Sequence, residues 1–186
     1  MKKITTYLFI ITILYFVLGT VNILFAWLGL LCMAIPFVLL FKNRKKTWCQ
    51  KYCPRSQLFM KTGRIKKPTR STPKLLTKGR LKWFVLGFFV FSMSLIVYNA
   101  VMVSLGNQPA SHSLTFLLFL KLPFTLPQFI SITGPSDWVY DFGYRMYSLM
   151  MTTTVIGLLL AFVYKPRTWC VICPIATVSD LCIKKR

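Results

Sequence analysis

Long uninterrupted runs of apolar residues dominate the pattern along the chain. Residues 4–41, 38 in all, contain no Asp, Glu, Lys, Arg or His. A membrane-spanning helix needs about 20 apolar residues at a rise of about 1.5 Å each, so this run suits two helices and is too long for one. Residues 19–22, Gly-Thr-Val-Asn, favour a turn. The pattern therefore predicts a helical hairpin, with helices over Ile4–Thr20 and Ile23–Phe41.

The first of these helices has one alternative interpretation. Lys2 and Lys3 precede its apolar stretch, as they would in a cleaved signal peptide. No cleavage site of the small-x-small type follows the stretch, so we interpret it as a span.

The second half of the chain repeats the pattern with a longer connection. Apolar stretches predict a third span from Trp83 to about Leu105 and a fourth from about Met146 to Tyr164. Between them, Leu114–Ile132 is apolar but broken by Lys121, Pro123 and Pro127, which favours an interfacial or re-entrant segment. The predicted fold class is an all-α membrane protein whose four transmembrane helices form two hairpins in parallel repeat.

The charged residues predict the orientation of these spans. The chain has 24 Lys and Arg against 3 Asp and Glu, and 15 of the basic residues fall within residues 42–82. With both termini on the same side as that loop, 22 of the 24 lie on one face, which the positive-inside rule assigns to the cytoplasm. The prediction is a bacterial inner-membrane protein whose basic face contacts anionic lipid. Nucleic-acid binding is not expected, because the sequence has no recognisable binding module.

The composition leaves cysteine as the chemically informative residue type. The only carboxylates are Asp137, Asp141 and Asp180, which argues against catalysis by paired carboxylates. A single histidine, His112, excludes a bis-histidine haem and a poly-histidine metal site. Six cysteines remain.

Four of these cysteines lie in a repeated motif. Residues 46–54 read Lys-Thr-Trp-Cys-Gln-Lys-Tyr-Cys-Pro, and residues 167–174 read Arg-Thr-Trp-Cys-Val-Ile-Cys-Pro. Each motif follows two predicted helices, which indicates a duplicated unit. The predicted organisation is a first hairpin with its motif (1–60), a basic linker (61–82) and a second hairpin with its motif (83–186). A twofold axis along the membrane normal would bring together Cys49, Cys53, Cys170 and Cys173.

Three interpretations of these four cysteines stay open on the residues alone. They are the ligands of an iron-sulfur cluster, the ligands of a structural zinc ion, or a cytoplasm-facing thiol-disulfide couple. Flanking basic residues are expected to lower the thiol pKa values and to offset the charge of an anionic cluster. Those residues are Lys46, Lys51, Arg55, Lys165 and Arg167.

The other residues near the motifs have plainer predicted roles. Trp48 and Trp169 are expected to anchor the motifs at the membrane interface, with a redox role as the alternative. Cys32, inside the second helix, and Cys182 are interpreted as structural, with a role as a spare ligand as the alternative for Cys182.

The order of two helices, Cys-Pro motif, two helices, Cys-Pro motif resembles the membrane part of the NapH/NosR-type 4Fe-4S proteins. The resemblance implies an electron-transfer subunit rather than a stand-alone enzyme, with a 4Fe-4S cluster on the four motif cysteines. It implies electron exchange between a quinone or cytoplasmic donor and a partner redox protein. The chain ends 12 residues after Pro174, without the ferredoxin-like domain of such proteins, so a separate ferredoxin-like or flavin-bearing partner is expected. A membrane scaffold or assembly factor with a structural zinc site is the alternative function.

One further polar pattern lies before the fourth predicted span. Asp137, Asp141 and Arg145 are spaced four residues apart and would share one face of a helix. They predict either an Asp141–Arg145 ion pair near a helix end, or a docking or proton-handling site for a quinone or partner.

Overall fold

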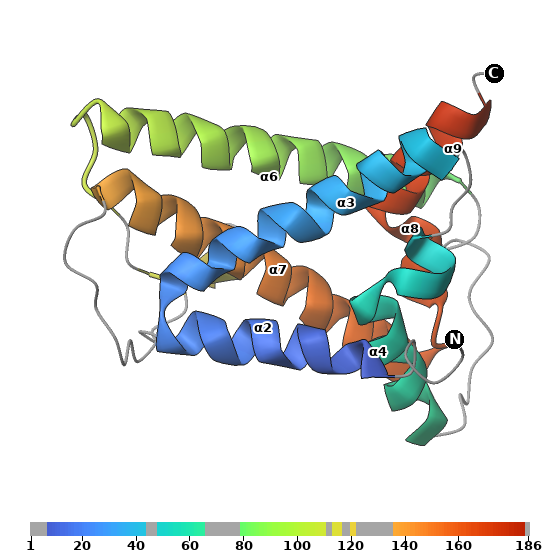
Figure 1. Ribbon diagram of the computed structural model, residues 1–186. Helices are drawn as coiled ribbons and strands as arrows, with labels where there is room; N and C mark the ends of the chain where they lie inside the picture. The colour runs from blue at the N-terminus through green and yellow to red at the C-terminus, as the bar shows by residue number, and fades with distance from the viewer. Residues whose placement is uncertain are drawn as a thin grey trace. The chain divides into compact units, whose positions relative to one another are not determined.

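The computed structural model describes residues 7–43, 48–65, 79–110, 113–116, 120–121 and 136–184, and most of these residues are helical (Figure 1). The N-terminal half contains α2 (Phe9–Val21), the 3-10 helix η1 (Ile23–Trp27), α3 (Leu28–Asn43), the π-helix η2 (Trp48–Tyr52) and α4 (Pro54–Ile65). The C-terminal half contains α6 (Arg80–Ser104), β1 (Thr115–Phe116), β2 (Leu120–Lys121), α7 (Asp137–Val163), α8 (Thr168–Ile172) and α9 (Pro174–Lys184).

Three of the described helices are long and apolar enough to cross a membrane. They are Ile23–Lys42, Arg80–Ser104 and Asp137–Val163. The helix before them, α2, has 13 residues and is about 20 Å long. Its predicted start at Ile4 lies outside the described residues, so the first of the four spans stays a prediction.

Asn22 ends the first helix of the predicted hairpin. Its side chain accepts a hydrogen bond from the N–H of Leu24 at 2.9 Å and so caps η1. The predicted turn is confirmed at this residue, but Gly19 belongs to α2. A Cβ at Gly19 would lie 2.7 Å from Cδ2 of Tyr147. The glycine therefore permits close packing and does not form the turn.

Helix α7 begins earlier than the sequence predicted, at Asp137 rather than at about Met146. The added turns pack on the start of the second helix. The ring centroids of Trp27 and Phe142 lie 4.6 Å apart. The indole N–H of Trp27 donates to the carbonyl of Val139 at 3.3 Å. Aromatic packing thus extends the helix beyond the apolar run that hydropathy detects.

The connection between α6 and α7 contains a strand pair that was not predicted. Strands β1 and β2 are antiparallel, with Thr115 opposite Lys121. The N–H of Thr115 donates to Ser148 Oγ of α7 at 3.2 Å, and this hydrogen bond attaches the strand pair to that helix. Most of the predicted interfacial or re-entrant segment, and His112, lie outside the described residues.

The chain divides into two compact units, and helices α2, α3, α6 and α7 contribute residues to both. One unit, called the motif unit here, contains residues 1–12, 32–89 and 154–186. The other, called the hairpin unit, contains residues 13–31 and 90–153.

The core of the hairpin unit forms where η1, which follows the first helix, meets α7. Ile23, Ala26, Leu114, Tyr144 and Tyr147 are buried together. The hydroxyl of Tyr147 donates to the carbonyl of Phe16 at 3.2 Å, so this tyrosine is satisfied inside an apolar core.

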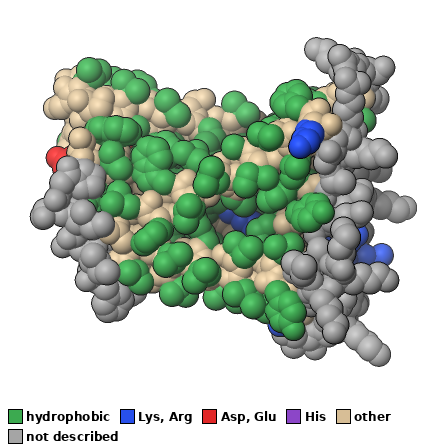
Figure 2. All heavy atoms as spheres, in the orientation of Figure 1, with side chains coloured by type: hydrophobic (Ala, Val, Ile, Leu, Met, Phe, Trp, Pro, Cys, Tyr) green, Lys and Arg blue, Asp and Glu red, His purple; other side chains and the backbone are tan. Residues whose placement is uncertain are grey.

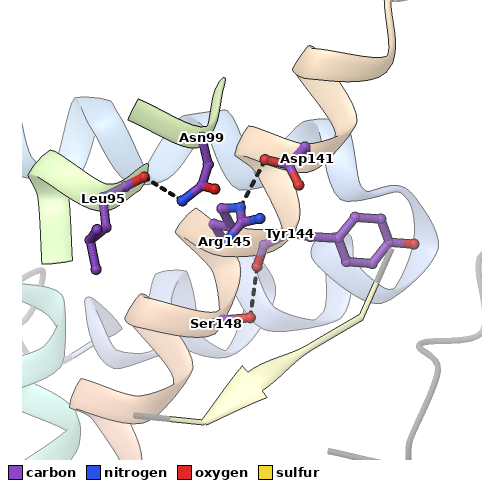
Figure 3. A network of polar contacts seen from close by, with 6 residues as sticks. All are labelled: Leu95, Asn99, Asp141, Tyr144, Arg145 and Ser148. Carbon is purple, nitrogen blue, oxygen red and sulfur yellow. Dashed lines mark hydrogen bonds and ion pairs between the residues drawn. The ribbon is translucent and has the colours of Figure 1, made fainter. Parts of the chain in front are cut away.

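A buried ion pair lies within α7 in the same unit (Figure 3). Arg145 Nε donates to Asp141 Oδ2 at 2.8 Å, and the side chain of Asp141 is 0% exposed while that of Arg145 is 23% exposed. The predicted pair is therefore confirmed, but it is largely buried. Asn99 of α6, also drawn in Figure 3, donates to the carbonyl of Leu95 at 2.7 Å.

The described surface is mostly apolar on the face shown in Figure 2. Large hydrophobic side chains are strongly exposed, including Phe41 of α3 and Phe84 of α6. In the most apolar 18-residue stretch of each helix, 17% of the residues of α6 are buried, whereas 50% of those of α7 are buried. Such exposure suits a lipid environment, and α7 is the most enclosed of the three long helices.

Candidate metal centre

Both cysteine motifs belong to the motif unit, and both end in the same local structure. In each, a single helical turn stops at a cysteine, and the proline that follows begins a new helix: Cys53 precedes Pro54 of α4, and Cys173 precedes Pro174 of α9. Proline suits this first helical position, because its missing N–H would have no partner there. The second cysteine of each motif therefore lies at a helix N-terminus.

The two motifs differ by one spacer residue, and the helical turn absorbs the difference. The two-residue spacer lies in an ordinary α-turn, α8. The three-residue spacer lies in the π-turn η2, where the N–H of Cys53 bonds to the carbonyl of Trp48 at 2.9 Å. Because a π-turn accommodates one extra residue, each spacer fits within a single helical turn before the proline.

Helix α4, which follows the first motif, packs against the second. The ring of Phe59 is 1% exposed and lies in a core cluster with Ala161, Trp169 and Ile172. A Cβ at Gly157 would lie 2.8 Å from Cε2 of Phe59. The missing side chain at residue 157 therefore lets α4 approach α7 closely.

The same face of α4 makes three more contacts with the segment around the second motif. Residues 56, 59, 60 and 63 share this face at helical spacing. A Cβ at Gly63 would lie 2.9 Å from Cβ of Pro166, and Arg167 Nη2 lies 3.5 Å from the sulfur of Met60. The remaining contact joins Ser56 Oγ to Cys170 Sγ at 3.6 Å. Helix α4 thus holds the two motifs together.

The cysteines of the two motifs are close enough to interact electrostatically. Cys53 of the first motif acts on both Cys170 and Cys173 of the second. Cys53 also interacts with Cys32 of α3. All six cysteines are described, and none forms a disulfide.

Burial controls the acidity of the second motif's thiols. Desolvation raises the pKa of Cys173 to about 11, and it also raises the pKa of Cys170. As the sequence suggested, the positive charge of Arg55 lowers the pKa of Cys173 and that of Arg167 lowers the pKa of Cys170. Both effects are smaller than the increase that burial causes. The predicted lowering of the pKa is therefore wrong for these two thiols, because loss of water outweighs the nearby positive charge. Lys46 lies outside the described residues.

Helix α9 offers hydrogen-bond donors to the sulfur of Cys173. The backbone N–H groups of Ile175 and Ala176 bond to it and lower its pKa, in opposition to burial. These are N–H groups of the first turn, which have no carbonyl partner within the helix. The site therefore stabilises negative charge on this sulfur once it is a ligand.

The two tryptophans of the motifs have different environments. Trp169 is 8% exposed and packs in the core of the motif unit, so its predicted role as an interfacial anchor is wrong. Trp48 is half-buried. The apolar contacts of Trp169 come from α4 and α7, which sequence reasoning could not bring next to it.

The donor set of the site suits a thiolate-ligated cluster. The four motif cysteines are soft sulfur ligands, and two arginines offset their charge. Within the described parts of the chain, no three Cys, His, Asp or Glu side chains gather as ligands of one metal ion would.

Sequence reasoning found the four motif cysteines but missed two residues close to them. Ser56 contacts Cys170 across 114 residues of sequence, and Cys32 interacts with Cys53. No local sequence pattern predicts that these two residues lie near the motifs, since serine in a helix and cysteine in an apolar span are both common. The position of Ser56, three residues after Cys53, was the available clue, because that register faces back toward the motif.

Comparisons with known proteins agree with the repeat. Residues 25–64 and 147–186 each match the family model described as a 4Fe-4S binding domain. Each match includes one Cys-Pro motif with the helices on both sides of it, and together they cover less than half of the chain. No curated protein and no solved structure matches the chain significantly. The chain therefore carries two segments of the 4Fe-4S binding type, which supports an iron-sulfur cluster of the 4Fe-4S kind as its cofactor.

Proposed function

We propose that this protein is a membrane-bound electron-transfer protein with a cluster held by Cys49, Cys53, Cys170 and Cys173. One observation carries the proposal: both Cys-Pro turns that match the 4Fe-4S binding domain belong to one compact unit, where α4 packs on the second turn. Sulfurs from both halves of the repeat therefore act on one another. The interaction of Cys53 with Cys170 and Cys173 supports a cluster shared by the two motifs.

The bound cluster would supply a one-electron carrier. The chain's own residues supply its environment. Phe59 and Trp169 exclude water on one side of the second motif. Arg55 and Arg167 bring positive charge toward Cys173 and Cys170, and backbone N–H groups of α9 bond to the Cys173 sulfur. Together these groups would stabilise the negative charge of a thiolate-ligated cluster in a buried position.

The proposal includes the membrane and the orientation within it. Three apolar helices of sufficient length support a membrane protein. The distribution of basic residues favours four spans in a bacterial inner membrane, with both termini and both motifs on the cytoplasmic side in contact with anionic lipid. The second motif follows the end of α7 at Val163, so the cluster would lie just outside the apolar span.

We further propose that this protein belongs among the NapH/NosR-type proteins and relays electrons for a partner. The donor would be a quinone or a cytoplasmic protein, and the acceptor a ferredoxin-like or flavin-bearing redox protein. The four cysteine sulfurs support this role. The sequence also offers no paired carboxylates for a hydrolytic reaction.

The test is anaerobic purification in detergent, followed by iron and sulfide analysis, absorption spectroscopy and EPR after reduction. We expect a brown protein with a reducible cluster. Cys49→Ser and Cys170→Ser should each abolish the cluster, because a shared centre needs both motifs. Cys182→Ser is the matched control, since Cys182 is exposed, and it should leave the cluster intact.

Two outcomes would contradict the proposal. A colourless protein with stoichiometric zinc would favour a scaffold or assembly factor with a structural metal site. Loss of the cluster in only one of the two motif variants would show that the motifs do not share a centre.

A further inference from the structure

We propose that Ser56 sets the reduction potential of the cluster by donating a hydrogen bond from its hydroxyl to the Cys170 sulfur. This inference rests on the proposed function, because it assigns Ser56 a role toward the cluster that Cys170 would ligate. Ser56 would be a positioning residue and not a ligand.

The contact with Cys170 is the distinctive feature of Ser56. The side chain is 5% exposed, and its Oγ lies 3.6 Å from the sulfur of Cys170. Hydroxyl groups elsewhere in these helices bond back to a carbonyl four residues earlier, as in Thr62 to Leu58 and Ser179 to Ile175. The described partner of Ser56 is instead a sulfur from the other half of the repeat.

The direction of this hydrogen bond depends on the state of the sulfur. In the structure the Cys170 thiol donates to Ser56 Oγ. Binding as a ligand removes the thiol proton to solvent and leaves a thiolate, which can only accept. The Ser56 hydroxyl then turns its own proton toward the sulfur and keeps that proton throughout.

Such a bond favours the reduced state of the cluster. Reduction adds one electron and makes the ligating sulfurs more negative, so a hydrogen bond to one of them becomes stronger. The potential of a cluster rises with hydrogen bonds to its sulfurs. Because Ser56 is buried, water does not replace the bond readily when the hydroxyl is removed.

The two halves of the repeat differ at this position. Ser56 comes three residues after Cys53, and the residue three after Cys173 is Ala176, which has no hydroxyl. The side-chain donor is therefore present on one half only. The repeat would hold the cluster in an environment that differs between its two motifs.

The experiment is a redox titration of the detergent-purified, cluster-loaded protein, monitored by EPR. Ser56→Ala should keep its iron content, and its reduction equilibrium should shift about tenfold toward the oxidised form, which is about 59 mV more negative for one electron. Ser179→Ala is the matched control, because Ser179 is equally buried in the motif unit but bonds to a carbonyl. Its potential should equal that of the unmodified protein.

A second pair of variants separates the hydroxyl from the shape of the side chain. Ser56→Thr and Ser56→Val have nearly the same shape, and only the first keeps the hydroxyl. The threonine variant should have the original potential and the valine variant the lowered one. Equal potentials in a loaded threonine and valine pair would overturn the inference while leaving the proposed function intact.

Two remaining outcomes are also decisive. Loss of the cluster in both Ser56→Ala and Ser56→Val, with retention in Ser56→Thr, would overturn the tuning role, because the hydroxyl would then be needed for binding. Absence of a cluster from the unmodified protein would instead refute the proposed function on which the inference rests.

Discussion

The ring of Phe59 occupies the space that a side chain at Gly157 would need. This contact joins the helix that follows the first cysteine motif to the long helix that precedes the second. The spacing of the motifs along the chain does not predict this contact, which holds α4 against the helix that leads to the second motif.

Gly157→Ala should destabilise the protein by about 1 to 3 kcal/mol, because the added methyl group overlaps the Phe59 ring. The free energy of unfolding in detergent and the iron content would measure the effect, and both should fall. Gly87→Ala is the control, since a Cβ at Gly87 meets nothing within 4 Å. There alanine should be neutral or stabilising, as its helix propensity implies. Equal effects of the two changes would contradict the packing role of Gly157.

Trp169→Ala should cost about 3 to 5 kcal/mol of unfolding free energy, because it empties a buried site between α4, α7 and α8. Trp169→Phe should cost less and should keep the cluster. The informative measurement on the phenylalanine variant is the rate of cluster reduction by dithionite. A slow rate in a stable, fully loaded protein would show that the indole has a redox role, contrary to our packing interpretation.

The ion pair in α7 should respond unequally to loss of its two partners. Arg145→Gln removes a charge-assisted hydrogen bond from the fully buried carboxylate of Asp141, which should cost about 3 to 5 kcal/mol. Asp141→Asn should cost less, because Arg145 is partly exposed. Replacing both should cost less than the two single changes added together. Additive losses in thermal unfolding would argue that the two charges do not stabilise each other.

The membrane orientation can be tested with reporter fusions. Alkaline phosphatase, which is active only after export, should be active when fused after residue 110 and inactive when fused after residues 78 or 186. Green fluorescent protein should show the opposite pattern. Phosphatase activity at residue 78 would reverse the orientation and would place the cysteine motifs outside the cytoplasm.

Several features were predictable from the sequence because they depend on local pattern. Long apolar runs predicted the three helices that are long and apolar enough to cross a membrane, and Asn22 lies in the turn predicted between the first two helices. The repeated Cys-Pro motif predicted the two regions that match the 4Fe-4S binding domain. The four-residue spacing of Asp141 and Arg145 predicted their ion pair.

Other features depend on contacts that no local pattern records. The early start of α7 depends on Trp27, more than a hundred residues away. The docking of α4 depends on glycines at 63 and 157, whose importance lies in the side chains that they lack. The raised pKa of Cys173 also escaped prediction, because flanking charges are visible in the sequence and desolvation is not.

The π-turn η2 bears on how repeats of this kind are recognised. Its wider turn takes up the extra residue of the first spacer, so both spacers fit within one helical turn before the proline. A search with a fixed number of residues between the two cysteines would miss one motif of this chain, whereas the Trp-Cys start and the Cys-Pro end find both.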